Sequence, residues 1–447
     1  MMAKMIIAAG TVLLCLACSS PAVTSRQITI SIFHTGNVAG ELKRCGCSEK
    51  QLGGVARRKT LYDRYRSGNT LLVDSGDVFF GSFEGLEGSP AFYAVKTAAM
   101  IRAMNLIGYD GCAVGDYDFA EGADFLLRAV KKANFPFLCA NIFKPQGKPV
   151  FEPFRVFHRA GLRVGVVALL DDHVVTNQYR NALHNLRISD PFEAAAKVLP
   201  GLRKRCDLIV ALLHFNLTDP DAFLKANPEI GVAIIGHHVG AGSARKVGNT
   251  VIVSDGTLGE KLGRLTLNLD VKGRVLSFVS SMIPVDEGVQ VDPGVQKEVD
   301  RFQRQVREGR FSEDVSFLPK KKNGPVYVGA GTCAPCHPVI YQRWSNTPHA
   351  YAYRSLVEKG EEYDPECVVC HVLGYGTRSG FIDTEKTPGF KNVQCESCHG
   401  AGEGHPGRRA MTARVPEDVC RKCHNDKHSP AFDYPAYLSI ANQCTLP

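Results

Sequence analysis

Four copies of one five-residue pattern, Cys-x-x-Cys-His, constrain this chain more than any other feature. The copies begin at Cys333, Cys367, Cys395 and Cys420. The pattern is the c-type haem attachment signature, in which two thiols bond to the vinyl groups and the adjacent histidine reaches the iron. The alternative is a pair of zinc ribbons, which also use Cys-x-x-Cys pairs. Because a zinc ribbon does not require a histidine after every pair, four haem c groups are the preferred interpretation.

The motifs assign the attachment residues and one axial ligand for each iron. The predicted covalent attachment sites are Cys333, Cys336, Cys367, Cys370, Cys395, Cys398, Cys420 and Cys423. The predicted proximal iron ligands are His337, His371, His399 and His424.

The predicted haem segment has one histidine too few to give every iron a distal histidine ligand. Four irons need four more ligands, and the same segment holds only His349, His405 and His428 as further histidines. Three haems can therefore be bis-histidine, which closes the iron to substrates and is typical of electron transfer. The fourth can be five-coordinate, bind Met411 or take a histidine from elsewhere in the chain. An open iron binds small ligands, so a redox enzyme at that haem is one alternative function.

The N-terminus has the pattern of an export signal. Lys4 precedes an apolar stretch over 5–16, which is too short for a comfortable membrane span. The sequence Leu14–Cys18 resembles a bacterial lipobox with Cys18 as the lipidated residue, and cleavage without lipidation is the alternative. Because c-type haem is attached outside the cytoplasm, we expect a periplasmic or surface-exposed protein with a lipid anchor in a bacterial membrane.

The length and charge of the chain place limits on its organisation and partners. At 447 residues, two or three domains are expected. The formal net charge of +8 omits the haem propionates, and the Lys and Arg residues are scattered, so we expect no nucleic-acid binding. The predicted units are a signal peptide at 1–18, an α/β domain at 27–285, a helical linker at 286–325 and a haem domain at 326–440.

The part before the haem motifs contains a series of short, continuous apolar runs. They occupy 28–33, 70–73, 111–114, 208–213 and 232–235, with helical patterns such as 54–66 and 191–205 between them. Continuous apolar runs predict strands that are covered on both faces, and the alternation with helices predicts a layered α/β architecture.

Asp and His residues follow the ends of these predicted strands. In open α/β sheets the ligand site lies at the carboxyl edge of the strands, so five strands can bring these donors to one point. Carboxylate and imidazole donors suit Zn, Mn or Fe, and suit Mg less well. An ordinary loop position is the alternative for any one of these residues taken alone.

The same stretches resemble the 5'-nucleotidase branch of the calcineurin-like metallophosphoesterases. The matches, in family order, are His34-Thr35, Gly53–Arg57, Asp74–Asp77 with Gly81-Ser82, Ala140–Ile142, His214, Gly236-His237 and Gly259–Gly263. The resemblance implies a four-layer αββα sandwich and a two-metal site that activates water for attack on a phosphoester. Family members also carry a C-terminal substrate-binding domain, and here the haem motifs stand in its place.

The chain departs from the family pattern at three motifs. Asp-x-His reads Asn37-Val38-Ala39, and Gly-Asn-His-Glu reads Gly115–Asp118, with Tyr117 in place of the catalytic histidine. Gly-His-x-His reads Gly236–Val239, so the ligands expected for the first metal are degraded at Asn37, Ala39 and Val239. The ligands that the resemblance implies for the second metal all remain: Asp77, Asp116, His214 and His237, with Asn37 as a weaker candidate. A single metal still acts as a Lewis acid, so phosphoester hydrolysis is a second alternative function.

The haem segment resembles the tetrahaem cytochrome c-554 family. The matches are Tyr327–Gly329, Trp344–His349, Cys367–Gly376, Val393–Gly400 and Cys420–His424. We expect sparse regular secondary structure there, because four macrocycles bury much apolar surface and replace a side-chain core.

Several other features have less specific interpretations. Cys45 and Cys47 can ligate a metal, form distant disulfides or be bystanders, whereas Cys112, Cys139 and Cys206 are expected to be buried apolar fillers. Apolar residues recur at helical spacing within 293–309, which predicts an amphipathic helix that packs on a core.

The combined prediction is an exported tetrahaem c-type cytochrome that transfers electrons. Its N-terminal metallophosphoesterase-like domain is expected to hold one divalent metal at most. The expected partners are periplasmic or membrane redox proteins, a membrane through the lipid anchor, and a phosphoester small molecule if the N-terminal site is active.

Overall fold

The computed structural model describes most of the chain. The described residues are 27–44, 52–81, 90–175, 182–183, 185–215, 220–237, 244–309, 326–377, 379–405, 411–412, 414–425 and 427–441. The expected signal peptide with Cys18 lies outside them, as do Cys45, Cys47 and Val239.

Within the described residues, the first large sheet has six strands in the order β14-β13-β1-β2-β3-β4. Strands β1 to β4 run parallel, and β13 and β14 pair antiparallel at one side. Their bounds are β1 (Ile28–Thr35), β2 (Thr70–Asp74), β3 (Gly111–Ala113), β4 (Phe137–Leu138), β13 (Lys261–Leu269) and β14 (Val275–Pro284).

The second large sheet of the described residues also has six strands, in the order β11-β12-β10-β9-β7-β6. Its four central strands are parallel, which explains their continuous apolar sequences, since both faces of a central parallel strand are covered. The bounds are β6 (Phe154–Arg159), β7 (Leu162–Leu170), β9 (Leu208–His214), β10 (Val232–Gly236), β11 (Arg245–Val247) and β12 (Thr250–Ser254). The short strands β5 (Ile142–Phe143) and β8 (Arg187–Ile188) form a separate pair.

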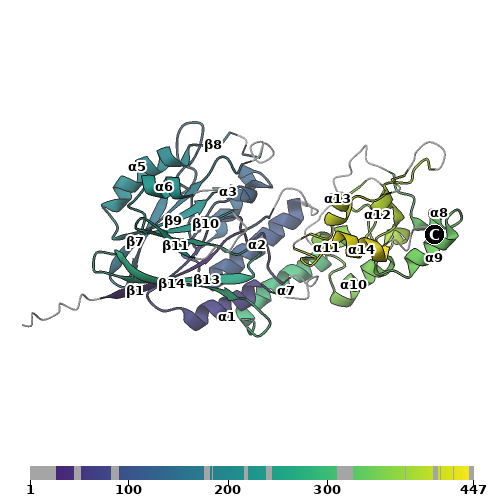
Figure 1. The fold of residues 1–447 in the computed structure, drawn as a ribbon, viewed down its shortest axis with the longest axis horizontal. Helices are drawn as coiled ribbons and strands as arrows, with labels where there is room; N and C mark the ends of the chain where they lie inside the picture. The colour runs from purple at the N-terminus through teal and green to yellow at the C-terminus, as the bar shows by residue number, and fades with distance from the viewer. Residues whose placement is uncertain are drawn as a thin grey trace, which may run out of the picture.

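The two sheets pack face to face, and helices cover their outer faces (Figure 1). On β1, Ile30 and Ile32 join the core between the sheets, whereas Phe33 points to the helix side, as the period of two in a strand requires. The helices are α1 (Val55–Tyr65), α2 (Pro90–Ile107), α3 (Ala123–Ala129) and α7 (Pro293–Arg307) on the first sheet, and α5 (Pro191–Arg203) and α6 (Asp221–Ala226) on the second. This is the expected four-layer αββα sandwich. The predicted fillers Cys112, Cys139 and Cys206 are buried.

Helix α7 is the amphipathic helix that the sequence predicts. Its apolar positions Val295, Val299, Phe302 and Val306 are all buried in the core of the first sheet's helix layer. The side chain of Asp292 caps its N-terminus by accepting a hydrogen bond from the Val295 N–H at 2.8 Å. The ring centroids of Phe302 and Phe92 lie 5.9 Å apart, so α7 packs on α2 as part of the N-terminal core.

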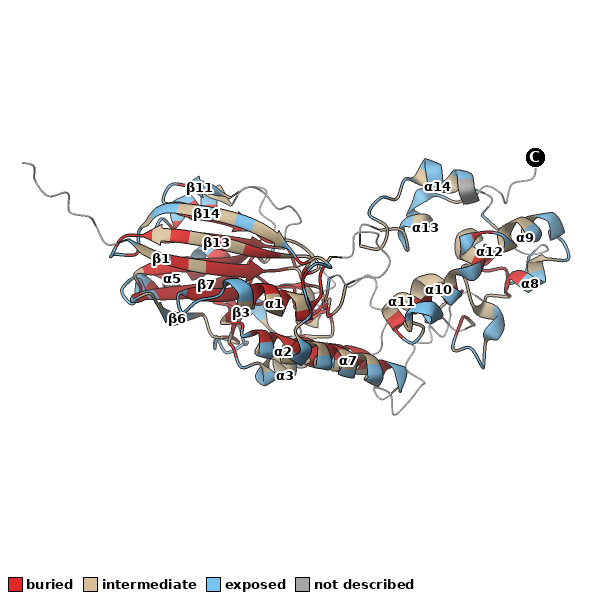
Figure 2. Ribbon diagram, turned by 90° about the horizontal axis from the view of Figure 1, so that it is seen from below, coloured by how far each residue is buried: buried red, intermediate tan, exposed pale blue. Residues whose placement is uncertain are grey.

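The C-terminal part consists of short helices and irregular segments, as expected. The helices are α8 (Ala330–Cys333), α9 (Pro338–Ser345), α10 (Ala352–Lys359), α11 (Pro365–His371), α12 (Cys395–His399), α13 (Glu417–Arg421) and α14 (Tyr434–Ala441). Its apolar core is small and centres on Tyr353, Leu356, Val368, Val372 and Phe381. Figure 2 shows the contrast: buried residues fill the strands of the N-terminal part and are few in the C-terminal helices.

Among the described residues, no helix is both long enough and apolar enough to span a bilayer.

The packing of α7 can be tested by truncating its central aromatic residue. We expect Phe302→Ala to destabilise the N-terminal unit by about 3–5 kcal/mol, because it leaves a cavity against Phe92. Urea unfolding followed by far-UV circular dichroism measures the change. Arg301→Ala, at an exposed position of the same helix, should change stability by no more than about 0.5 kcal/mol. Equal effects of both substitutions would contradict the assignment of α7 to the core.

Candidate functional site

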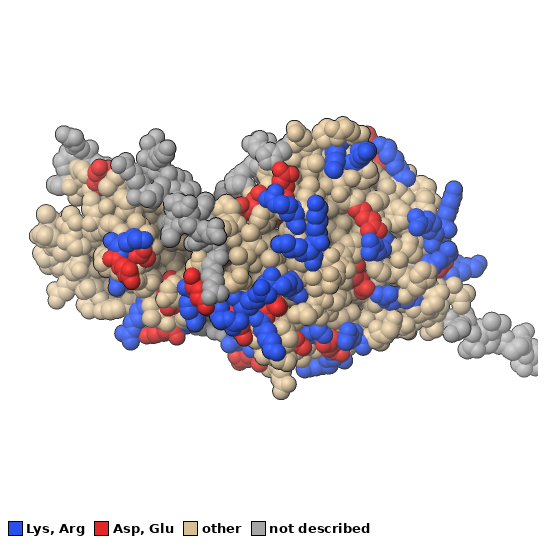
Figure 3. Space-filling view, turned by 180° about the vertical axis from the view of Figure 1, so that it is seen from behind, with Lys and Arg blue, Asp and Glu red and all other residues tan. Residues whose placement is uncertain are grey.

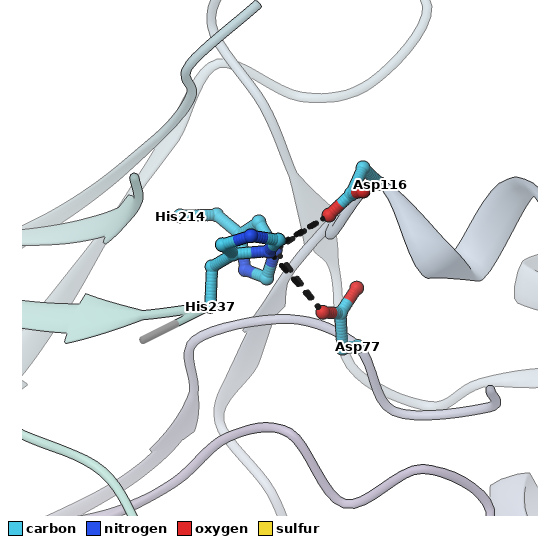
Figure 4. A group of neighbouring side chains, drawn as sticks. All are labelled: Asp77, Asp116, His214 and His237. Carbon is cyan, nitrogen blue, oxygen red and sulfur yellow. Dashed lines mark hydrogen bonds and ion pairs between the residues drawn. The ribbon is translucent and has the colours of Figure 1, made fainter. Parts of the chain in front are cut away.

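Four side chains at or just after the ends of four strands meet at the carboxyl edge of the parallel strands. Asp77 follows β2, Asp116 follows β3, His214 ends β9 and His237 follows β10. Each offers one ligand atom, and these atoms all lie within 4.8 Å of one another (Figure 4). The set is the one that the family resemblance implied for the second metal.

The two imidazoles and two carboxylates point at one another. His214 Nε2 lies 3.2 Å from Asp77 Oδ2 and 3.1 Å from Asp116 Oδ1. His237 Nδ1 lies 3.8 Å and 3.1 Å from the same two oxygens. The other nitrogen of His214, Nδ1, donates a hydrogen bond to the Ser75 carbonyl at 2.9 Å. This bond fixes the tautomer and leaves Nε2 able to bind a metal.

The electrostatics of the cluster favour a cation. Burial lowers the pKa of His214, but the carboxylates of Asp77 and Asp116 outweigh burial and hold that pKa well above its ordinary value. For His237, burial is likewise outweighed by hydrogen bonds to Asp116 and Asp77, which raise the pKa to about 9. Without a metal, protons on the imidazoles therefore neutralise the carboxylates. Among the described residues, the buried Asp116 Oδ2 has no hydrogen-bond partner, so the donor set has an unused ligand atom that fits a divalent cation.

The backbone around the site adopts conformations that non-glycine residues rarely tolerate. Asn37, Ala39, Asp77 and His237 have φ angles of 50°, 55°, 57° and 67°. Each such residue costs of order 1–3 kcal/mol and persists only where the surroundings enforce it. Gly76 is required for a different reason, because a Cβ at its position would lie 2.7 Å from His214 Nδ1. The strain is concentrated where the four loops converge, as is common at functional sites.

Asp118 positions the loop that carries Asp77, and the sequence reasoning gave it no role of its own. Its buried carboxylate accepts hydrogen bonds from the N–H groups of Asp77 at 3.2 Å, Gly115 at 3.0 Å and Phe79 at 3.0 Å. Burial and then the charge of Asp77 raise its pKa to about 7. In the sequence, the position of Asp118 two residues after Asp116 was the signal that could have indicated this role.

Asp255 also supports the site and was missed. It accepts hydrogen bonds from the Ser75 hydroxyl and from His34 Nδ1, and all three residues are buried. Because the Ser75 carbonyl holds His214, Asp255 acts on the candidate ligand through Ser75. The signal was the apolar run at 250–254, which ends in an acidic residue like the other strands.

Two positions that depart from the family pattern, Asn37 and Tyr117, lie beside the cluster. The Asn37 side-chain oxygen accepts a hydrogen bond from the His237 N–H at 3.1 Å. Tyr117, in place of the family's catalytic histidine, has its ring centroid 5.7 Å from that of His237. Asn37 therefore braces the backbone of one candidate ligand, and Tyr117 packs against its ring.

In the C-terminal part, each of the four Cys-x-x-Cys-His motifs forms about one helical turn. In the first and fourth, the His337 and His424 N–H groups donate to the carbonyls of Cys333 and Cys420 at 2.9 Å. The second ends α11, and the third is α12. A helical turn places residues three and four apart on one face, so both thiols and the histidine of a motif face the same side.

Three of the four motif histidines have a hydrogen-bond contact at Nδ1 that orients the ring: His371, His399 and His424. His371 Nδ1 donates to the Ala352 carbonyl and His399 Nδ1 to the Thr412 carbonyl, both at 2.6 Å. His424 Nδ1 lies 3.3 Å from the Ser429 hydroxyl. These bonds leave Nε2 as the atom available to a metal.

Two pairs of histidines from different parts of the segment lie close together. The ring centroids of His337 and His405 lie 6.5 Å apart at an interplanar angle of 25°. Those of His349 and His424 lie 6.1 Å apart at 57°. The third distal candidate, His428, lies beside α11. Burial lowers its pKa to about 4, and Lys427 and His371 add to the effect. Within the described residues, its Nδ1 has no hydrogen-bond partner.

The two halves of the chain are similar to different groups of known proteins. Residues 332–400 match the model of the cytochrome c554 and c-prime family. The N-terminal region is homologous to 5'-nucleotidases. It is 31 % identical over 198 residues to the 5'-nucleotidase of Vibrio cholerae, a match that covers 42 % of this chain and 34 % of that protein. The snake venom 5'-nucleotidase of Naja atra is 26 % identical over 314 residues, which cover 62 % of this chain and 57 % of that protein. The matched region thus spans about a third of the length of the bacterial relative.

Solved structures show the same fold. The calcineurin-like phosphoesterase YfkN from Bacillus subtilis superposes with a TM-score of 0.56 at 21 % identity, over 64 % of this chain and 99 % of that one. The 5'-nucleotidase precursor from Thermus thermophilus gives a TM-score of 0.52 at 24 % identity, over 63 % of this chain and 59 % of that one. The N-terminal part therefore has the calcineurin-like phosphoesterase fold.

The positioning role of Asp118 gives a test of the metal cluster. We expect Asp118→Asn to weaken zinc binding by about 10- to 100-fold, because it releases the backbone that holds Asp77. Isothermal titration calorimetry of the metal-free protein measures the affinity. Asp124→Asn, at an exposed position in the first turn of α3, serves as the control and should leave the affinity unchanged. Equal zinc affinity in the wild type and Asp118→Asn would contradict the role of Asp118.

Proposed function

We propose that the protein is an exported tetrahaem c-type cytochrome that transfers electrons, with a single-metal phosphoesterase-like domain at its N-terminus. The observation that carries the proposal is the proximity of the His337 ring to that of His405 and of the His349 ring to that of His424. Each pair takes one histidine from a Cys-x-x-Cys-His motif and one from outside the motifs.

The separation of these rings fits an iron between them. Two iron–imidazole bonds of about 2.0 Å place the ring centroids about 6 Å apart. The separations of 6.5 Å and 6.1 Å agree with this expectation. We therefore propose His405 as the distal ligand of the first haem and His349 as that of the fourth.

The remaining histidine favours the second haem. His428 lies close enough to His371 and Glu366 for their charges to act on its pKa, and both belong to α11. Assigning His428 to the second haem leaves His399 without a distal histidine among the described residues. The third haem is then the one whose iron is open or takes a ligand of another kind.

Bound haem would supply a one-electron redox couple. The residues of the chain would hold the haem and determine which irons are closed to substrates. The motif cysteines hold each macrocycle covalently, and the paired histidines close two irons to substrates. The carbonyls of Ala352 and Thr412 orient two of the proximal imidazoles. The apolar core of five buried residues is small, so macrocycle surface would provide much of the packing.

The N-terminal site supports a metal more clearly than it supports hydrolysis. Asp77, Asp116, His214 and His237 would hold one ion of Zn, Mn or Fe, which supplies a Lewis acid when bound. The first-metal ligands are degraded, and Tyr117 replaces the family's catalytic histidine. The assembled ligand set is the observation that keeps a phosphoester hydrolase as the second candidate.

Location and partners follow from the haem chemistry and the N-terminal sequence. We propose export to the periplasm or outer surface, with Cys18 as a lipid anchor, and redox proteins of the periplasm or membrane as partners. On the face shown in Figure 3, Lys and Arg side chains are interspersed with Asp and Glu. Such a mixed surface suits brief encounters with redox proteins better than it suits nucleic acid.

Removing one distal ligand tests the haem assignment. In the oxidised wild type we expect one high-spin haem of four by electron paramagnetic resonance. His405→Ala should add a second, because the first iron loses its sixth ligand. Haem content should stay at four, and His158→Ala, at an exposed position on β6, should leave the spectrum unchanged. An unaltered spectrum in His405→Ala would rule out this ligand.

A phosphoesterase screen separates the two candidate functions. We expect metal-loaded protein to show no metal-dependent hydrolysis of phosphomonoesters or phosphodiesters, because the ligands of the first metal and the catalytic histidine are missing. Metal-dependent activity that Asp77→Ala abolishes and His405→Ala does not would instead establish the hydrolase.

A further inference from the structure

The two halves of the molecule meet through ion pairs that gather at the second haem-attachment segment. Lys96 Nζ on α2 contacts both carboxylate oxygens of Glu366 at 2.6 Å. Lys43 pairs with Glu361, and its Nζ also lies 3.7 Å from Asp364. These acids precede or begin α11, whose Cys367, Cys370 and His371 form the second motif. In Figure 1, α11 lies at the end of the C-terminal part nearest α2 and α7.

A third pair reaches the same region from the other direction. Lys427 Nζ lies 2.5 Å from Glu41 Oε1. Lys427 directly precedes His428, the candidate distal ligand of the second haem. The N-terminal domain thus contacts the second haem segment on both its proximal and its candidate distal side.

These ion pairs are more than surface contacts, because several of their side chains are nearly buried. The exposed fractions are 8 % for Lys96, 9 % for Asp364 and 12 % for Glu41. Removing one partner of a buried pair leaves an uncompensated charge, which is strongly destabilising. We therefore expect the two halves to be held in one relative arrangement rather than to move independently.

We call these three sets of ion pairs the joint. Two of its N-terminal residues, Glu41 and Lys43, belong to the loop that borders the metal cluster. This loop, 37–44, lies along the loop that carries Asp77. Asn37 N–H donates to the Gly76 carbonyl at 2.9 Å, Ala39 N–H to the Asp77 carbonyl at 2.9 Å and Gly40 N–H to the Val78 carbonyl at 2.8 Å. A shift of Asp77 on metal binding is therefore passed directly to the loop bearing Glu41 and Lys43.

Lys96 lies against the same loop. A Cβ on Gly40 would lie 3.0 Å from Lys96 Cε and 3.1 Å from Nζ, so the ammonium end rests on the backbone at this position. Gly40 has a φ of +73°, which also favours glycine. A continuous path of contacts thus runs from Asp77 through Ala39 and Gly40 to Lys96, and then to Glu366 beside Cys367.

We propose that this joint couples the N-terminal metal site to the second haem, so that a divalent cation bound at Asp77, Asp116, His214 and His237 raises the reduction potential of that haem. The inference rests on the proposed function of both sites. A reduced haem carries one positive charge less than an oxidised one, so a nearby cation is favoured in the reduced state. Because coupling between two binding equilibria is reciprocal, reduction of the haem should tighten metal binding by the same factor. The N-terminal domain then acts as a metal-responsive regulator of electron transfer, which explains an intact ligand set in a degraded enzyme.

The test uses the full-length protein with its haems and the redox-inactive ion Zn²⁺. Spectroelectrochemical titration compares metal-free and Zn²⁺-loaded protein. We expect one of the four haems to shift upward by about 59 mV, which corresponds to about tenfold tighter zinc binding in the reduced state.

Variants of the joint show whether the ion pairs carry the effect. Lys96→Met combined with Glu366→Gln removes the central ion pair without leaving a lone buried charge. This double variant should reduce the zinc-induced shift in reduction potential to less than half of its wild-type value. Lys96→Glu combined with Glu366→Lys restores a pair and should recover it. Lys59→Met, which removes a lysine–carboxylate pair within α1, is the matched control and should leave the shift unchanged. Haem content and zinc stoichiometry are measured for every variant.

The outcomes are distinguishable. One bound zinc, four haems and no shift in the wild type would overturn the coupling while leaving both sites intact. Failure to bind zinc would overturn the proposed metal site and the coupling with it. An unchanged shift in reduction potential after loss of the Lys96–Glu366 pair would show that this pair does not carry the coupling.

Discussion

The convergence of parallel strand ends at one edge determines the functional arrangement of this molecule. At that edge lie the residues that follow strands β1, β2, β3, β9 and β10. The polar groups that the apolar strand sequences exclude are therefore found there. The edge collects Asp77, Asp116, His214 and His237 into one cluster. The loop after β1 borders this cluster and then continues to the lysine and glutamate that hold the haem segment. Metal site and domain joint are therefore consequences of the same topology.

The C-terminal part follows a different rule, because it has few apolar side chains to bury. The helices α11 and α12 are each about as long as a motif requires, and each presents two thiols and a histidine on one face. In the proposed holoprotein, the haems would act both as cofactors and as most of the core. The ligand pairs cross the segment, since His337 lies close to His405 and His349 lies close to His424. Each bound iron would tie together two stretches that are distant in sequence, as a disulfide does in a small secreted domain.

Sequence reasoning predicted the elements with a strong local signal. Periodicity placed the buried face of α7, and continuous apolar runs identified the central strands. The haem attachment residues given by the motif spacing stay a prediction. The metal cluster was predicted through family resemblance, and the structure brings the same four residues together. Asp118 and Asp255 were missed because each acts by accepting hydrogen bonds from a loop, which leaves no spacing pattern. The Lys96–Glu366 pair joins positions 270 apart in the chain, and no local rule indicates which charged residues will meet at such a distance.

The central claim is that the four motifs hold four haems, since electron transfer and the coupling both depend on it. Mass spectrometry of the intact, denatured protein measures this most directly, because thioether-linked haem stays attached. The account predicts a mass increase equal to four haems on a single chain, with a matching pyridine haemochrome absorbance. A chain without covalent haem that instead contains zinc ions bound by these cysteines would contradict it.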